Sequence, residues 1–236
     1  MVNAVGTLSG VGVGPGDPEL VTVKAMRLIS QAPVIAYLAA AGRESTALAI
    51  ARPYVPATAR HIVIDMPMLT ERAPGEKAYD AGAAAIAAEL DDGRDVVMLC
   101  EGDPFFYGSF MYVFARLSPR YRCAVIPGIT SMTASAAALG QPLSAREDVV
   151  KVLPATLDAQ RLREELATAS NAVIIKVGRH FAKVRGILEA LELGSRAHVV
   201  IRASHADQRV SPLAEIAAEQ LPYFSTILVF AGPRPW

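Results

Sequence analysis

Short, apolar, β-rich runs alternate with Ala- and Leu-rich segments of helical period along most of this 236-residue chain. Near-continuous apolar strands that alternate with helices are typical of a parallel sheet covered by helices on both faces. The first half therefore predicts an α/β domain. Its expected strands are residues 5–13, 34–38, 61–66, 96–100 and 121–126, and its expected helices are residues 18–31, 46–51, 79–90 and 106–117.

The second half repeats the alternation without repeating the sequence. No low-complexity linker separates the halves, so we place the boundary at the turn Pro127-Gly128 and predict domains of residues 1–127 and 128–236. The expected strands of the second domain are residues 148–153, 172–177, 198–202 and 226–230, and its expected helices are residues 131–139, 158–169 and 181–191.

The composition narrows the classes of function. Hydrophobic residues make up 52% and charged residues 19%, which excludes a disordered chain. The net charge of +0 gives no indication of a nucleic-acid partner or an acidic membrane partner. The apolar runs are shorter than the ~20 residues that cross a bilayer, residues 1–10 do not resemble a signal peptide, and the two cysteines form no metal motif. We therefore expect a cytoplasmic protein with no metal and no membrane or nucleic-acid partner.

A glycine-rich turn, GVGVGPGDPEL, spans residues 10–20, between an expected strand and an expected helix. It is not a Walker loop, because no Lys-Ser or Lys-Thr follows it. It is also a poor dinucleotide fingerprint, because Asp17 would repel a pyrophosphate at the helix N-terminus. Asp17 followed by Pro18 equally resembles an ordinary helix start. A ligand-binding loop and a helix cap both remain open.

Two further turns follow buried strands: Gly102-Asp103-Pro104, and Pro127-Gly128 with Thr130 and Ser131 after it. Because the carboxyl ends of parallel strands meet at one edge of a sheet, we expect the three turns to converge on one crevice. The crevice would offer backbone amides, hydroxyls, carboxylates and aromatic walls, but few cations. Such a set suits a ligand with an amine, a ribose and a flat base. S-adenosylmethionine fits this description, whereas NAD and ATP fit it poorly.

The same segments resemble the tetrapyrrole methylase family, the class III S-adenosylmethionine-dependent methyltransferases. The opening motif is matched by GVGVGPGDPELVTVKA, and the second and third by EGDPFFYGSFMY and VIPGITSMTA. Later segments of the family are matched by VLPATL, VIIKVGR and IRASHADQRV. Within the family, EGDPFFYGSFMY together with IIKVGR is most similar to the precorrin-2 methyltransferases that act at carbon 20.

The resemblance implies a fold of two α/β domains, with a parallel sheet in the first, a mixed sheet in the second and the cofactor in the cleft between them. It also implies a homodimer. The implied reaction transfers a methyl group from S-adenosylmethionine to carbon 20 of precorrin-2, a tetrapyrrole, and gives precorrin-3A and S-adenosylhomocysteine in cobalamin biosynthesis. Alternatives are a cobalt-loaded substrate, another ring carbon, or diphthine synthesis. A cofactor-binding regulator without catalysis is a further alternative, while Asp17 disfavours a dinucleotide-linked oxidoreductase.

The resemblance also assigns site residues. The expected cofactor contacts are Pro15, Glu101, Gly102, Asp103, Phe106, Thr130, Ser131, Pro154, Ala155, Val177 and Ala203. A base is needed only to remove a proton after the transfer, and the candidates are Asp17, Asp103 and Tyr107, with Glu101 beside them.

Basic residues should bind the carboxylates of the substrate. We expect Lys176, Arg179 and Arg146 foremost, and then Arg43, Lys151, His180, Arg202 and His205. Some relatives carry an acidic residue where this chain has Leu38, so that base cannot be carried over. Cys100 stands where relatives often have Ser.

Overall fold

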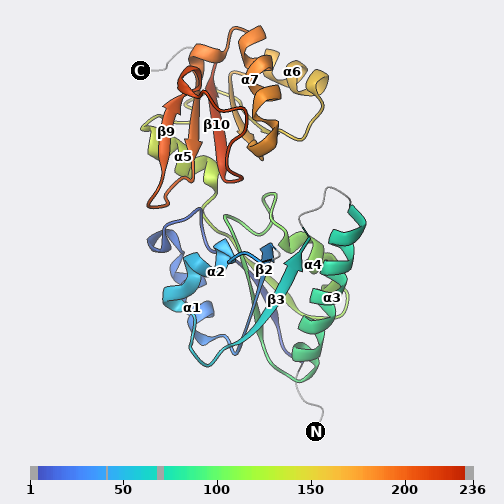
Figure 1. The fold of residues 1–236 in the computed structure, drawn as a ribbon. Helices are drawn as coiled ribbons and strands as arrows, with labels where there is room; N and C mark the ends of the chain where they lie inside the picture. The colour runs from blue at the N-terminus through green and yellow to red at the C-terminus, as the bar shows by residue number, and fades with distance from the viewer. Residues whose placement is uncertain (1–4, 41, 68–71, 232–236) are drawn as a thin grey trace. The chain divides into compact units, whose positions relative to one another are not determined.

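The computed structural model describes residues 5–40, 42–67 and 72–231. The chain divides into two compact units, Met1–Thr130 and Ser131–Trp236. Each unit is built around its own five-stranded sheet (Figure 1). The first sheet is parallel and the second is mixed, as the family resemblance implies.

In the first unit, strands and helices alternate as the sequence predicts. The strands are β1 (Leu8–Gly12), β2 (Val34–Ala40), β3 (Arg60–Met66), β4 (Val96–Cys100) and β5 (Cys123–Ile126). The helices are α1 (Val23–Gln31), α2 (Thr46–Ala51), α3 (Arg72–Asp91) and α4 (Phe110–Leu117). The strand order is β3-β2-β4-β1-β5, so β1 lies between β4 and β5. This order brings the ends of those three strands together.

Both faces of this sheet are covered, with α1 and α2 on one side and α3 and α4 on the other (Figure 1). Alternate residues of a strand therefore enter different cores. Met98 of β4 packs with α3 and α4, whereas Leu99 packs with α1 and α2. Burial on both faces explains why the strands are apolar without alternation.

The second unit contains α5 (Ser131–Leu139), β6 (Val150–Pro154), α6 (Ala159–Ala167), β7 (Asn171–Ile175), α7 (Phe181–Ala190), β8 (Ala197–Ile201), β9 (Arg209–Pro212) and β10 (Ser225–Phe230). The strand order is β6-β7-β10-β8-β9. Strand β10 is antiparallel to both β7 and β8, so these two run in the same direction. Helices α6 and α7 cover one face and α5 the other.

The structure differs from the expected elements in several details. The helix expected over residues 18–31 is a 3-10 turn, Pro18–Leu20, followed by α1, because the Thr22 hydroxyl accepts the N–H of Ala25 and starts a new helix. The helix expected from residue 106 begins at Phe110, since Tyr107 has a left-handed backbone with φ of 56°. The short strand β9 was not expected at all.

Candidate functional site

The first two turns are joined directly by backbone hydrogen bonds. The N–H of Gly102 donates to the carbonyl of Gly14 at 2.8 Å, and the N–H of Gly14 donates back at 3.4 Å. Both glycines have left-handed backbones, with φ of 79° at Gly14 and 63° at Gly102. Two glycines in this conformation therefore let the strand-end turns pair beyond the sheet.

The third turn packs against the other two through glycines that have no room for a side chain. A Cβ on Gly128 would lie 2.0 Å from the carbonyl oxygen of Gly102, and a Cβ on Gly12 would lie 2.5 Å from the same oxygen. The Cβ on Gly12 would also lie 2.7 Å from the Cα of Gly128. The predicted convergence of the three turns is confirmed. We call Gly12, Gly102 and Gly128 the glycine junction.

The carboxylate of Asp103 fastens the second turn to the third. One oxygen accepts the backbone N–H groups of Phe105 at 2.9 Å and Phe106 at 3.1 Å. The other accepts the N–H of Gly128 at 3.0 Å. Because the carboxylate accepts three backbone donors, Asp103 shapes the glycine junction through its hydrogen bonds.

The other acidic candidates differ in their surroundings. Asp17 caps the 3-10 turn, with its side chain accepting the N–H of Glu19 at 2.8 Å. Glu101 follows β4, and although its surface is accessible to solvent, many protein atoms surround its carboxyl group. Desolvation raises the pKa of the Glu101 carboxyl, and hydrogen bonds from the backbone N–H groups of Glu101 and Ala47 oppose this rise. Asp17 thus has the capping task, whereas Glu101 holds its proton to higher pH than an ordinary glutamate.

The loop after Asp103 presents aromatic side chains. Gly108 closes this loop, because a Cβ there would lie 2.6 Å from the carbonyl oxygen of Asp103 and 2.5 Å from that of Pro104. Phe105 and Tyr107 are 49% and 41% exposed, while Phe106 is half-buried. The turns thus combine backbone groups with aromatic surfaces.

The remaining expected contacts of the first unit also lie at its turns. Pro15 is buried in the first turn, and Thr130 follows the glycine junction in a half-buried position. Ser131 is exposed as the first residue of α5, the helix that opens the second unit.

In the second unit, the expected cofactor residues gather at the carboxyl ends of β6, β7 and β8. Pro154 ends β6, and the next residue, Ala155, donates its N–H to the carbonyl of Ile175 at 2.8 Å. Val177 and Ala203 are buried in equivalent positions, two residues beyond the ends of β7 and β8.

Each of these two residues follows a basic residue with a left-handed backbone. The φ angles are 56° at Lys176 and 52° at Arg202. Such a conformation is costly for residues other than glycine, and Arg146 shares it with a φ of 51°. We call Lys176, Arg179 and Arg202 the basic edge of the second unit.

Not all basic candidates reach this edge. Arg146 lies in a loop that the side-chain amide of Asn171 ties down, through a bond of 2.8 Å to the carbonyl of Leu143. Asn171 begins β7, whereas Lys176 follows its end. Five strand residues separate the two edges by on the order of 17 Å. The structure therefore does not bring Arg146 together with Lys176 and Arg179.

Other basic candidates already have partners or lie elsewhere. The Lys151 ammonium donates to the Glu165 carboxylate at 2.9 Å and to the Thr168 hydroxyl at 2.7 Å. Arg202 donates to Asp207 at 2.7 Å and lies 3.3 Å from the ring nitrogen of His205.

Two candidates remain. The pKa of His180 is lowered by burial and by the nearby charges of Lys183 and Arg179, so it is a weaker base than ordinary histidine. Arg43 belongs to the first unit, beyond the end of β2.

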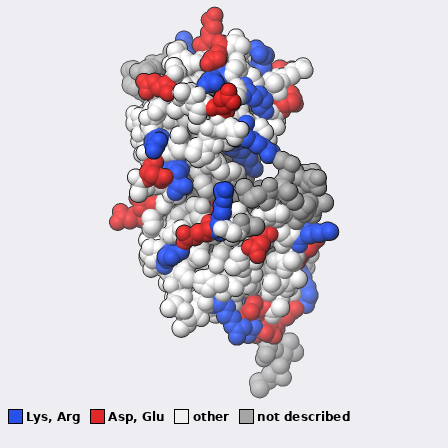
Figure 2. All heavy atoms as spheres, viewed as in Figure 1, with Lys and Arg blue, Asp and Glu red and all other residues white. Residues whose placement is uncertain are grey.

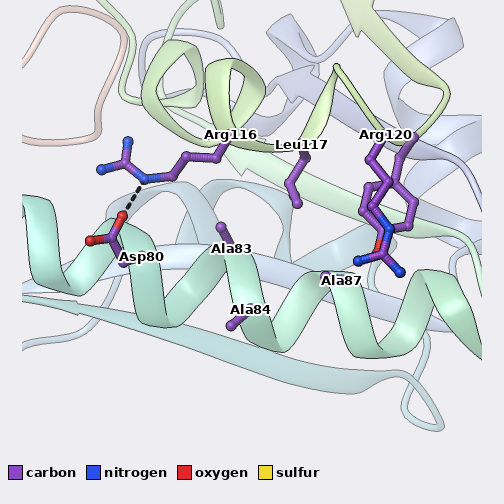
Figure 3. Close-up of a pocket in the computed structure, with 8 residues that line it drawn as sticks. Asp80, Ala83, Ala84, Ala87, Arg116, Leu117 and Arg120 are labelled. Atoms are coloured by element: carbon purple, nitrogen blue, oxygen red, sulfur yellow. Dashed lines mark hydrogen bonds and ion pairs between the residues drawn. The ribbon is translucent and has the colours of Figure 1, made fainter.

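A pocket of about 280 Å³ lies away from the turns, between α3 and the end of α4 (Figure 3). Figure 3 shows Arg116 reaching to Asp80, at 2.7 Å, beside a row of alanines on α3. Arg116 is paired with Asp80 and Arg120 with Asp91, so the charged groups of the pocket are already neutralised.

Among the described residues, neither possible metal ligands nor the charges visible in Figure 2 mark a second candidate site. On the face shown in Figure 2, basic and acidic side chains are interspersed rather than gathered by sign. Residues 5–40, 42–67 and 72–231 contain no group of three or more His, Cys, Asp and Glu that could hold a metal ion. Within those ranges, no helix has both the length and the hydropathy needed to span a membrane.

Comparison with known proteins identifies one protein family across nearly the whole chain. The sequence profile of the Tetrapyrrole (Corrin/Porphyrin) Methylases matches residues 7–217. A precorrin-2 C(20)-methyltransferase from Sinorhizobium sp. is 42% identical over 233 residues, which cover 95% of each chain. The cobalamin biosynthesis protein CobIJ of Mycobacterium tuberculosis is 44% identical over 241 residues, which cover 99% of this chain and 47% of CobIJ. The chain therefore spans about half the length of that curated relative.

Solved structures share the fold. The uroporphyrin-III C-methyl transferase of Thermus thermophilus, complexed with S-adenyl homocysteine, is 26% identical, with a TM-score of 0.70 and coverage of 94% of this chain and 97% of that one. A cobalt precorrin-4 methyltransferase gives a TM-score of 0.77 at 20% identity, with 94% of each chain covered. The profile match over residues 7–217 and the 42% identity to the Sinorhizobium protein show that the chain belongs to the tetrapyrrole (corrin/porphyrin) methylases.

Proposed function

We propose that this chain transfers a methyl group from S-adenosylmethionine to carbon 20 of precorrin-2, giving precorrin-3A in cobalamin biosynthesis. The observation that carries the proposal is the 42% identity, over 95% of both chains, to a protein named precorrin-2 C(20)-methyltransferase. The glycine junction supports it, because it lies in the segments that carry the resemblance and at the strand ends where α/β sheets bind ligands.

The turns of the first unit fit S-adenosylmethionine. Residues 10–20, 100–110 and 126–131 contain no Lys or Arg, so they suit a ligand without phosphates. Bound there, S-adenosylmethionine would supply the methyl group from its sulfonium centre. The proposed contacts of the first unit and of the linking segment are Pro15, Glu101, Gly102, Asp103, Phe106, Thr130 and Ser131. From the second unit we propose Pro154, Ala155, Val177 and Ala203, whose backbone would bind the adenine.

The residues mainly position the reactants. Methyl transfer from a sulfonium is an in-line displacement, so the alignment of donor and acceptor carbon supplies much of the rate. A fixed backbone serves this need, and the three hydrogen bonds of Asp103 fix the backbone around the glycine junction. We therefore propose Asp103 as a positioning residue.

The proton that leaves the methylated carbon needs an acceptor. Asp17 and Asp103 already accept backbone N–H groups. Tyr107 stays a candidate base, because 41% of its surface is exposed and so open to the substrate. Glu101, with its raised pKa, is a candidate proton acceptor in the same turn.

The peripheral carboxylates of the substrate need cations. We propose that Lys176 and Arg179 supply them, since both follow the end of β7. Arg146 belongs to the opposite edge of its sheet, so we leave it out of this group.

Assembly and location are further parts of the proposal. The family resemblance supports a homodimer. The biosynthetic role named for the relatives supports a cytoplasmic location.

A cobalt-loaded substrate is the second candidate. A relative from Salmonella typhimurium named cobalt-precorrin-2 C(20)-methyltransferase is 30% identical over 229 residues, which cover 95% of this chain. The higher identity to the Sinorhizobium protein, 42%, favours the metal-free substrate.

Label transfer would test the proposal. Purified protein is incubated without oxygen with precorrin-2 and S-adenosylmethionine carrying a ¹³C-labelled methyl group, and the label is located by NMR. We expect the label at carbon 20. Label at another ring carbon would contradict the regiochemistry. Label only on cobalt-precorrin-2 would support the second candidate, and label on neither tetrapyrrole would contradict both.

A further inference from the structure

Phe105 is an exposed aromatic residue whose position the structure fixes closely. Its backbone N–H donates to the carboxylate of Asp103 at 2.9 Å. Its ring meets Phe114 edge-on, with 5.1 Å between centroids, and lies 6.0 Å from Phe110. Phe110 is fully buried over Gly10, where a Cβ would lie 2.4 Å from its ring. Phe105 thus rests on the core from one side and remains 49% exposed.

The same hydrogen-bond network fixes this ring relative to the glycine junction. Asp103 accepts the N–H of Phe105 with one carboxylate oxygen and the N–H of Gly128 with the other. One side chain thus joins the backbone of Phe105 to the glycine junction. Phe105 is therefore a fixed aromatic surface whose backbone is tied to the glycine junction.

The chemistry around the glycine junction decides which part of a substrate can bind there. The three turns contain no Lys or Arg, so they cannot neutralise the peripheral carboxylates of a tetrapyrrole. The pyrrole rings of the macrocycle present apolar faces, and an aromatic side chain binds such a surface well. The cations instead belong to the basic edge of the second unit. A tetrapyrrole that reaches these turns would therefore meet apolar surface there and not cations.

We infer that Phe105 is a substrate-selecting residue, whose exposed ring contacts the face of the tetrapyrrole macrocycle. The inference rests on the proposed function and adds a specific contact to it. Phe105 acts in binding the acceptor and takes no part in binding the cofactor. Its loss therefore weakens tetrapyrrole affinity and leaves the affinity for S-adenosylhomocysteine unchanged.

Three variants test this contact. Phe105→Ser removes the apolar surface, and Phe105→Leu keeps an apolar side chain without the ring. Tyr112→Leu is the matched control, because Tyr112 lies on the exposed side of α4 and is 40% exposed. Tetrapyrrole binding is titrated by absorbance, S-adenosylhomocysteine binding by calorimetry, and methyl transfer by label. Thermal melting checks that each variant is folded.

We expect Phe105→Ser to weaken tetrapyrrole binding about tenfold, with Phe105→Leu between it and the wild type. Tyr112→Leu should bind both ligands like the wild type. A Phe105→Ser variant that binds the tetrapyrrole normally, or that loses S-adenosylhomocysteine affinity equally, would overturn the inference alone. A wild-type protein that neither binds nor methylates a tetrapyrrole would overturn the proposed function and the inference together.

Discussion

The strand-end turns of the two units use different residues at left-handed backbone positions. Within two residues of a strand end, the left-handed positions of the first unit include Gly14 and Gly102, and those of the second include Lys176 and Arg202. Glycine adopts this conformation at little steric cost, whereas another residue costs of order 1–3 kcal/mol. Glycine thus lets two backbones approach each other in the first unit. In the second unit, a charged residue adopts the strained conformation at the corresponding position. The difference indicates that the first edge works through its backbone, whereas the second adds cations to its backbone groups.

The largest expected effect comes from filling the glycine junction. In Gly128→Ala the new Cβ would meet the carbonyl oxygen of Gly102 at 2.0 Å, and that contact is with backbone. We expect loss of S-adenosylhomocysteine binding and a large fall in melting temperature. Gly186→Ala is the control, because a Cβ there meets nothing within 4 Å in helix α7, and it should be neutral or stabilising. A Gly128→Ala variant that melts like Gly186→Ala would show that the backbones are not packed this closely.

Removal of the Asp103 carboxylate should rank second. Asp103→Ala leaves three backbone N–H groups without their acceptor, and we expect a cost of about 3 kcal/mol in the free energy of unfolding. Asp103→Asn keeps one oxygen as an acceptor and should recover part of that cost. Urea denaturation measures both. Equal stability of the wild type and the alanine variant would remove the structural role proposed for Asp103.

Relief of the strain at Lys176 should have a smaller effect, of opposite sign on stability. Lys176→Gly removes a left-handed side chain and should stabilise the protein by about 1 kcal/mol, while the KM for the tetrapyrrole rises. Lys176→Met removes the charge but keeps the strain, so it should raise KM without the gain in stability. If the glycine variant is no more stable than the methionine variant, the second edge does not store strain at this position.

The smallest expected effect concerns Lys151, to whose ion pair with Glu165 we assign a structural role. The hydrogen bond from Lys151 lowers the pKa of Glu165 below its ordinary value of 4.5, and the charges of Arg161 and Lys151 add to this. A lowered pKa contributes stability that is present above pH 4.5 and is lost as the pH falls through the lowered value. Glu165→Gln should therefore lose less stability than the wild type between about pH 5 and pH 3. Urea denaturation at each pH measures the free energy of unfolding. An equal loss in the wild type and in Glu165→Gln would contradict a structural role for the Lys151–Glu165 pair.

The sequence alone was enough to predict the convergence of the three turns. Near-continuous apolar runs separated by helices imply a parallel sheet, and the carboxyl ends of such strands share an edge. The triple hydrogen bond of Asp103 was beyond prediction, because it depends on the distance between two turns that are far apart in the chain. The strain at Lys176 and Arg202 carries no sequence signal, since no glycine marks those positions.

The sequence itself indicates that Arg146 and Lys176 lie apart. Arg146 precedes an expected strand, whereas Lys176 follows one. Because β6 and β7 run parallel, a residue before one strand and a residue after the other lie at opposite edges. The direction of the strands therefore separates Arg146 from Lys176. The short strand β9, by contrast, has only four residues and no pattern to predict it.

The central claim is that the cofactor is bound without cations, while the basic edge of the second unit binds the carboxylates of the substrate. The most direct test measures the Kd of S-adenosylhomocysteine and the KM of the tetrapyrrole over one range of ionic strength. Salt screens contacts between exposed charges and leaves neutral contacts nearly unaffected. The account predicts a KM that rises with salt and a Kd that stays constant. A Kd that rises as steeply as the KM, or a KM that does not change with salt, would contradict it.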